Sequence, residues 1–234
     1  MKGIIISIEG TDGAGKHTQQ QLLASDLKEL GYTVFEQSFP NYESGSSEPV
    51  KMYLSGAFGD TANTLDAYQA STLYAVDRLC TYKKDIEPHY NNGEIILFDR
   101  YVQSNYIHQC SKIDDMKDKL KFLEWNEDLE FYKHKLPRPD LIFFIEMPVA
   151  KSLELAKARA EYKTGETKDI HEEDTAYMQK AYDNGLDLAR KLGWTIIHCT
   201  DIRGNVKHIE DIHKEIMDIA TEFLKNHKTQ ETEE

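Results

Sequence analysis

A glycine-rich segment directly after the first apolar run constrains the fold of this chain most. Residues 4–8 form a short β-branched run, and residues 10–18 (GTDGAGKHT) follow it with the pattern G-x-x-x-x-G-K. A helical stretch, 16–30, begins inside this motif and ends before Gly31, which is a good helix stop. A strand, a glycine loop and a helix in this order predict a loop whose backbone amides, together with Lys16, bind a phosphate group.

Apolar runs and helical stretches alternate along the rest of the chain. Buried strands are expected at 4–8, 33–39, 94–98, 141–147 and 195–199. Helical spacing is found at 16–30, 65–82, 114–132, 149–161, 174–192 and 206–224. This alternation predicts an α/β fold, a five-stranded parallel sheet flanked by helices on both faces.

Two polar segments stand apart from this pattern. Residues 162–173 (YKTGETKDIHEE) are rich in charge and contain a glycine, which predicts a surface loop inserted between two helices. Residues 225–234 (KNHKTQETEE) form a polar tail that we expect to be disordered. The length of 234 residues fits one α/β domain over residues 1–224.

Charge and cysteine content exclude several classes of protein. There are 41 Asp and Glu against 28 Lys and Arg, a net charge of −13, so a protein that coats nucleic acid is not expected, whereas a small anionic ligand is compatible. The cysteines Cys80, Cys110 and Cys199 are far apart, which argues against a disulfide framework or a zinc site and for a reducing compartment. No apolar run approaches the ~20 residues that span a bilayer. We therefore expect a cytoplasmic protein without a membrane partner.

One position of the phosphate loop departs from its motif. The residue after Lys16 is ordinarily Ser or Thr, whose hydroxyl binds Mg²⁺, but here it is His17. An imidazole is a poor ligand for a hard cation, and Thr18 is rotated by about 100° around the helix. This predicts that magnesium is held by phosphate oxygens, water and nearby acids.

A second motif, Asp99-Arg100-Tyr101, follows the expected strand 94–98. Ligands of open α/β sheets bind at the carboxyl ends of the strands. Asp99 could hold magnesium or its water, and Arg100 could bind a phosphate with its planar fork. The alternative is an ordinary salt bridge at a strand end.

Taken together, segments 9–16 and 99–105 resemble the thymidylate kinase family of P-loop kinases, as do Phe39-Pro40 and Pro139-Asp140-Leu141. The resemblance covers residues 1–224. It implies transfer of the γ-phosphoryl group of ATP to dTMP, giving dTDP and ADP, with ATP and Mg²⁺ in the site. It also implies a lid at about 157–173, and a homodimer that packs through the helix matching 65–79.

The resemblance further implies roles for the residues that meet ATP. Lys16 would contact the β- and γ-phosphates, and Asp12 would touch the phosphates or, with Asp99, the metal. The remaining residues of the predicted ATP site are Gly10, Gly13, Gly15, His17, Thr18 and Arg159. One branch of the family carries an arginine at position 13, and the other supplies that cation from its lid. Here the lid region holds Lys157, Arg159, Lys163 and Lys168, of which we expect Arg159 and then Lys163 to act in catalysis, unless they are only a solvated basic helix end.

The nucleotide acceptor is expected to meet a separate set of residues. By resemblance, Tyr74 stacks on thymine and Arg78 donates to its O4, and their i, i+4 spacing places both on one helix face. Arg100 would hold the dTMP phosphate, and Asn105 would contact N3 and O4. The other expected contacts are Phe39, which is apolar, and either Tyr106 or His108, which would crowd a ribose 2′-hydroxyl.

Two other functions remain open from the sequence. A deoxynucleoside kinase shares the fold but phosphorylates a sugar hydroxyl, and it usually carries Glu-Arg-Ser where this chain has Asp99-Arg100-Tyr101. The presence of His17 prompts the second alternative, a nucleotide-binding protein with little catalysis.

Overall fold

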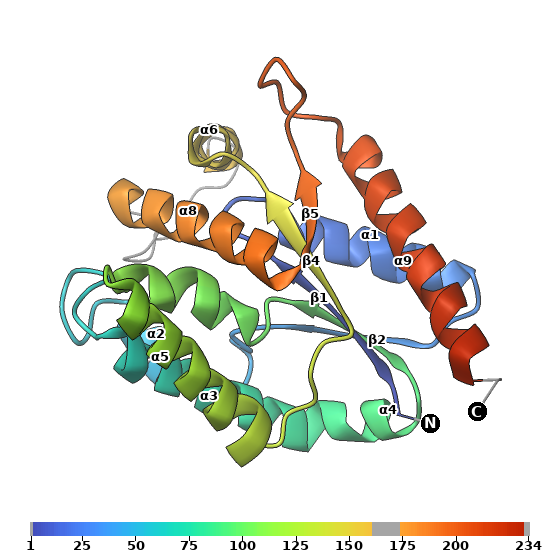
Figure 1. Ribbon diagram of the computed structural model, residues 1–234, viewed down its shortest axis with the longest axis horizontal. Helices are drawn as coiled ribbons and strands as arrows, with labels where there is room; N and C mark the ends of the chain where they lie inside the picture. Colours follow the sequence, from blue (N-terminus) through green and yellow to red (C-terminus); the bar gives the residue numbers. More distant parts are fainter. Residues whose placement is uncertain (1, 161–173, 232–234) are drawn as a thin grey trace.

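A parallel five-stranded sheet forms the centre of the molecule, as the alternation of apolar runs predicts (Figure 1). The computed structural model describes residues 2–160 and 174–231, with side chains over 2–155 and 174–227. The strands are β1 (Ile4–Glu9), β2 (Val34–Ser38), β3 (Ile95–Asp99), β4 (Leu141–Glu146) and β5 (Thr195–His198). Their order in the sheet is β2-β3-β1-β4-β5.

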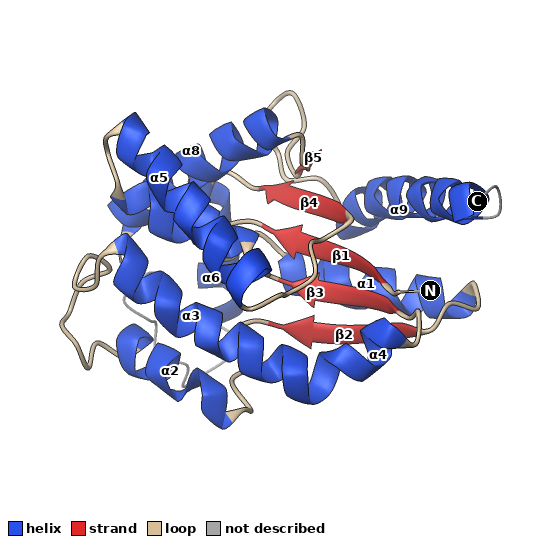
Figure 2. Cartoon of the chain, turned by 60° about the horizontal axis from the view of Figure 1, so that its bottom comes forward, coloured by secondary structure: helices blue, strands red, loops and turns tan. Residues whose placement is uncertain are grey.

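The register of the sheet brings the two sequence motifs to one edge. Ile8 of β1 pairs with Asp99 of β3, and Glu9 pairs with Phe144 of β4. All strands run in the same direction, so their carboxyl ends meet at the same edge (Figure 2). The phosphate loop after β1 and the residues after β3 are therefore neighbours, although about 90 residues separate them in the sequence.

Helices cover both faces of the sheet. The bounds are α1 (Lys16–Glu29), α2 (Glu48–Leu54), α3 (Ala67–Thr81), α4 (Glu87–Asn91), α5 (Met116–Glu127), α6 (Val149–Ala160), α8 (Thr175–Leu192) and α9 (Ile209–Glu231). Capping residues in the sequence explain where several of these helices begin or end. Asp66 and Gln69 form a capping box at the start of α3, Asp174 caps α8, and Gly193 ends α8 at φ 71°. None of the described helices is long and apolar enough to cross a membrane.

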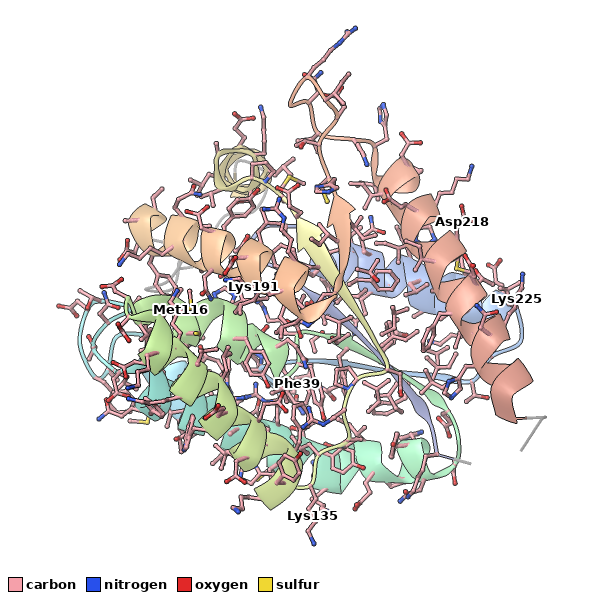
Figure 3. The ribbon with its side chains drawn as sticks, in the orientation of Figure 1. Phe39, Met116, Lys135, Lys191, Asp218 and Lys225 are labelled. Carbon is pink, nitrogen blue, oxygen red and sulfur yellow. The ribbon has the colours of Figure 1, made fainter. Side chains whose placement is uncertain are left out.

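Successive strand residues point to opposite faces, which creates two hydrophobic cores. Ile6 and Ile8 pack with Leu23 of α1 and Ile216 of α9 on one face. Ile5 packs on the other face with residues of α8 and with Phe39, which lies in the interior of the molecule (Figure 3). Figure 2 shows α1 and α9 together on one side and α3 and α5 on the other.

The helical segments differ from the predicted ones at three places. The helix predicted over 65–82 continues through a π-helical turn, Tyr82–Ile86, into α4, and α2 was not predicted. The last helix extends to Glu231, so most of the expected polar tail, from Lys225 onward, continues α9. Polar composition alone does not end a helix, because no glycine or proline interrupts the segment.

Candidate active site

The phosphate loop joins β1 to α1 and encloses its own lysine. Gly13 has φ 75°, and a Cβ there would lie 3.1 Å from Cβ of Ser152, so this position requires glycine. Lys16 Nζ donates a hydrogen bond to the carbonyl oxygen of Thr11 at 2.7 Å. Burial lowers the pKa of Lys16 to about 8. The loop thus holds a buried ammonium group at the N-terminus of α1, which suits a phosphate ligand.

His17 lies beside the expected metal ligand of β3. Its Nδ1 is 3.6 Å from Oδ2 of Asp99, and its side chain is 63 % exposed, while the neighbouring Thr18 is exposed as well. Oδ1 of Asp99 is buried and has no hydrogen-bond partner among the described residues. Asp99 therefore retains acceptor capacity for a cation or its water.

The described side chains include no group of three or more His, Cys, Asp or Glu residues that could hold a metal ion by themselves. Asp12 and Asp99 offer carboxylate oxygens, the donors that Mg²⁺ prefers. This donor set fits a magnesium ion only if phosphate oxygens and water complete its coordination.

Arg100 crosses from the end of β3 to the phosphate loop. Its Nη2 donates to Oδ1 of Asp12, and its Nη1 donates to the carbonyl oxygen of Gly10 at 3.1 Å and lies 3.0 Å from Nε2 of His108. Burial lowers the pKa of the guanidinium, but the carboxylates of Asp12 and Asp99 outweigh burial and the net pKa is raised. Arg100 is thus a permanent cation next to the loop.

A cavity opens beside Arg100 and is lined by most of the residues that are predicted to bind the acceptor nucleotide. Its lining includes the charged residues Asp12 and Arg100 together with aromatic and amide side chains. The predicted residues found there are Phe39, Tyr74, Arg78, Asn105 and His108, and Pro40, Tyr42, Leu54, Tyr101, Ser104 and Gln109 complete the lining. Residues from several distant segments therefore meet at one place.

Arg78 is held by a buried carboxylate that the sequence did not reveal. Its Nε and Nη2 both donate to Oε1 of Glu130, and the two side chains are 2 % and 0 % exposed. Burial raises the pKa of Glu130, but Arg78 and His134 outweigh burial and lower it. Nη1 of Arg78 makes no hydrogen bond within the described residues, so this nitrogen can donate to a ligand in the cavity.

The two residues predicted to lie against the ribose, Tyr106 and His108, belong to the π-helical turn Asn105–Gln109, and only one of them faces the cavity. His108 lines the cavity, whereas Tyr106 does not: its hydroxyl donates to Glu127, and its ring lies 6.5 Å from that of Trp194. The turn places these side chains on different sides, so the expectation for Tyr106 is corrected. Asn105 lines the cavity and donates through Nδ2 to Asn126 at 2.9 Å.

Gln109 belongs to the same turn and was missed by sequence reasoning. It is almost fully buried and lines the cavity, and its Oε1 has no hydrogen-bond partner among the described residues. A buried amide oxygen without a partner is costly, which favours a ligand donor at this position. Its place directly after His108 was the signal that could have identified it.

The predicted lid lies largely outside the described residues. Lys163 and Lys168 belong to the segment that the structure does not describe. Lys157 and Arg159 lie in α6, but their side chains are also outside the described part. Their roles stay predictions.

Comparisons with known proteins agree with this architecture. The sequence model of the family "Thymidylate kinase" matches residues 8–216 of this chain. A thymidylate kinase of Mycobacterium tuberculosis is 29 % identical over 192 residues, covering 82 % of this chain and 87 % of that one. A probable thymidylate kinase of Thermococcus gammatolerans is 29 % identical over 224 residues, covering 95 % and 98 %. The solved structure of the thymidylate kinase from Candida albicans superposes with a TM-score of 0.70 at 22 % identity, covering 97 % and 94 %.

The parallel sheet, the phosphate loop and the adjoining cavity define a P-loop kinase that acts on a small phosphorylated acceptor. Because the family match spans most of the sequence, the family can be stated as well. The chain belongs to the thymidylate kinase family, and its activity is the ATP-dependent phosphorylation of dTMP to dTDP. The predicted fold, family and reaction are thus confirmed.

Proposed function

We propose that the cavity beside Arg100 binds dTMP, with its phosphate on Arg100 and its base among Tyr74, Arg78 and Asn105. One observation carries this assignment: a single cavity is lined both by Arg100 and Asp12 at the phosphate loop and by aromatic and amide side chains. Because Arg100 also donates to the Gly10 carbonyl, a phosphate bound to it would lie next to the loop that holds ATP. This arrangement brings the two phosphates together.

In this arrangement the protein provides position and charge and needs no nucleophile of its own. An oxygen of the dTMP phosphate attacks the γ-phosphorus of ATP, and the bond from that phosphorus to the β–γ bridging oxygen breaks. Lys16 neutralises charge on the β- and γ-phosphates, and Arg100 orients the attacking phosphate. Asp12 and Asp99 would hold Mg²⁺, which neutralises phosphate charge when bound. Arg159 and Lys163 would add positive charge from the lid.

The base end of the cavity supports recognition of thymine. Nη1 of Arg78 would donate to O4, and the ring of Tyr74 would stack on the base. The Gln109 amide offers an acceptor for the N3 proton. His108, not Tyr106, would lie against the ribose.

An assay of ADP formation tests this function against its alternatives. We expect rapid ADP release with dTMP and Mg²⁺, and little with thymidine or without an acceptor. A faster rate with thymidine would indicate a deoxynucleoside kinase. ATP binding without ADP formation from any acceptor would indicate a nucleotide-binding protein, and full activity in excess chelator would exclude the role of magnesium.

A homodimer through α3 and α5 is the second part of the proposal. Tyr68 and Val76 on α3, and Met116 and Leu120 on α5, are exposed, and the Tyr68 ring lies 4.8 Å from that of Trp125 on α5. The two helices therefore offer neighbouring apolar side chains to a second copy.

The cytoplasmic location stays a prediction from the cysteine content.

Sedimentation velocity tests this interface. Val76→Asp and Leu120→Asp are expected to shift the protein from dimer to monomer, because a charge would be buried at the contact. Leu192→Asp changes an equally exposed leucine on α8 and should leave the dimer intact. A wild-type protein that sediments as a monomer at all concentrations would contradict the proposal.

A further inference from the structure

Glu9 is a buried carboxylate to which the mechanism above gives no role. It ends β1, directly before the phosphate loop, and is 0 % exposed. Its Oε1 accepts a hydrogen bond from the backbone N–H of Tyr101 at 2.7 Å, and its Oε2 accepts one from the Ser104 hydroxyl at 2.7 Å. Both donors belong to the turn that follows Arg100, so both oxygens of one carboxylate hold the same turn.

The backbone of this turn needs such support. Arg100 has φ 67°, a left-handed conformation that residues other than glycine rarely adopt. Its N–H donates to the carbonyl oxygen of Ile8 at 3.0 Å. The Ile8 carbonyl thus accepts from the N–H of Arg100 itself, and the Glu9 carboxylate accepts from Tyr101 and Ser104, which follow Arg100 in the chain. The last two residues of the strand before the phosphate loop therefore restrain the backbone at Arg100 and directly after it.

A second path connects Glu9 to the guanidinium itself. Nη1 of Arg100 lies 3.4 Å from the Ser104 hydroxyl oxygen, and that hydroxyl donates to Glu9. An N–H, an O–H and a carboxylate thus follow one another, and hydrogen bonds in such a chain polarise one another. The cations that face Glu9 are Arg100 and Lys16. Glu9 therefore acts on the direction of the Arg100 side chain through both the backbone and Ser104.

We propose that Glu9 is a positioning residue that presets Arg100 for the phosphate of the acceptor nucleotide. The inference rests on the proposed function, in which Arg100 holds the dTMP phosphate. Glu9 touches no reacting atom. It acts through the Tyr101 amide and the Ser104 hydroxyl, so that Arg100 needs little reorganisation when dTMP binds.

A double-mutant cycle on dTMP binding tests the inference. Affinity is measured by calorimetry at pH 8 without ATP, for Glu9→Gln in the wild-type protein and in the Arg100→Ala variant. Glutamine keeps the size of the side chain, but it has only one acceptor oxygen for two donors. We expect a loss of about tenfold in the wild-type background and of less than about twofold when Arg100 is absent, because coupled residues are non-additive. Ser104→Ala should show the same dependence on Arg100.

Ser7→Ala is the matched control. Ser7 is buried on the same strand, and its hydroxyl has no hydrogen-bond partner among the described residues. Its removal should leave dTMP affinity unchanged. Thermal unfolding of each variant identifies losses of dTMP affinity that come from misfolding. If Glu9→Gln does not fold, the same cycle with Ser104→Ala tests the inference.

The outcomes separate the inference from the function on which it rests. Equal losses in both backgrounds would overturn the positioning role, as would unchanged affinity in both Glu9→Gln and Ser104→Ala when Arg100→Ala weakens binding. Unchanged dTMP affinity in Arg100→Ala itself would overturn the proposed phosphate site and the positioning role with it.

Discussion

The guanidinium of Arg78 and the carboxylate of Glu130 form an ion pair in which neither side chain is appreciably exposed. Fifty-two positions separate the two residues, which α3 and the π-helical turn Asp128–Lys133 bring together. The pair orients the residue that we expect to read the base. It also links the base end of the cavity to the stability of the fold.

Glu130→Ala is expected to destabilise the protein by about 3–5 kcal/mol, because Arg78 would remain as a buried cation without its partner. Glu130→Gln keeps an acceptor and should cost less. Urea unfolding gives both values, and Glu127→Ala, which removes a more exposed carboxylate of the same helical region, provides a comparison. A loss below about 1 kcal/mol in Glu130→Ala would show that the pair contributes little.

Arg78→Ala should reduce discrimination between bases. In the wild type, the Arg78 donor would face the amino donor of cytosine, and an unsatisfied buried group costs about 1–3 kcal/mol, so dCMP should be about ten- to a hundredfold worse than dTMP. A missing methyl costs less, so dUMP should fall between them. Steady-state rates for the three acceptors measure this order. Arg138→Ala, which changes a 51 % exposed arginine, is the control and should leave the order of the three acceptors unchanged. Equal rates with dCMP and dTMP in the wild type would contradict the role of Arg78 in recognising the base.

The activity should depend on the protonation of Lys16. Burial lowers the pKa of this lysine to about 8, so in the free enzyme it loses its charge above that pH. We expect kcat/KM for ATP to fall above about pH 8, whereas kcat should hold to higher pH because bound phosphates favour the charged lysine.

Replacing Lys16 gives an independent check of the phosphate loop. Lys16→Ala should keep the fold and raise the barrier to reaction by about 3–4 kcal/mol. Lys28→Ala, at an exposed lysine of the same helix, should have no effect on the rate. A folded Lys16→Ala variant with near wild-type kcat would show that the loop is assigned wrongly.

His17→Ser is expected to keep or raise kcat and to lower the Mg²⁺ concentration needed for half-maximal rate. A serine hydroxyl is a hard oxygen ligand, whereas the imidazole that lies 3.6 Å from Asp99 is not. Steady-state rates of the wild type and His17→Ser, measured as a function of Mg²⁺ concentration, test this expectation. His198→Ser, at another exposed histidine, is the control. A large loss of kcat would mean that His17 itself has a necessary contact.

Glu9 should make the stability of the protein depend on pH. Burial raises its pKa from 4.5 to about 7, so between these values the folded state binds more protons than the unfolded state. The contribution of Glu9 to the free energy of unfolding therefore declines as pH rises through this window, by about 3 kcal/mol in total. Urea unfolding at pH 5 and pH 8 should show a smaller decline for Glu9→Gln than for the wild type. Parallel pH profiles would contradict this.

Local patterns account for most of the fold. The β-branched runs, the glycine loop and the helix stop at Gly31 act over a few residues each, so the strands and the main helices follow from periodicity and turn chemistry. The extension of α9 past Lys225 differs from the expected disordered tail, because a polar composition without glycine or proline does not by itself end a helix. The short helix α2 was missed because its seven residues, Glu48–Leu54, are too few for a clear period.

The sequence by itself determined the phosphate loop, the family resemblance and the residue types of the acceptor site, because motif spacing is local chemistry. Only the tertiary structure decided that His108 and not Tyr106 faces the cavity, since Tyr106 donates instead to Glu127 and its ring lies beside that of Trp194. It alone joined Arg78 to Glu130, and Glu9 to the turn after Arg100, over separations of 52 and about 90 residues. Such pairs form when the sheet and its helices pack, and buried polar groups then select partners that no local pattern encodes.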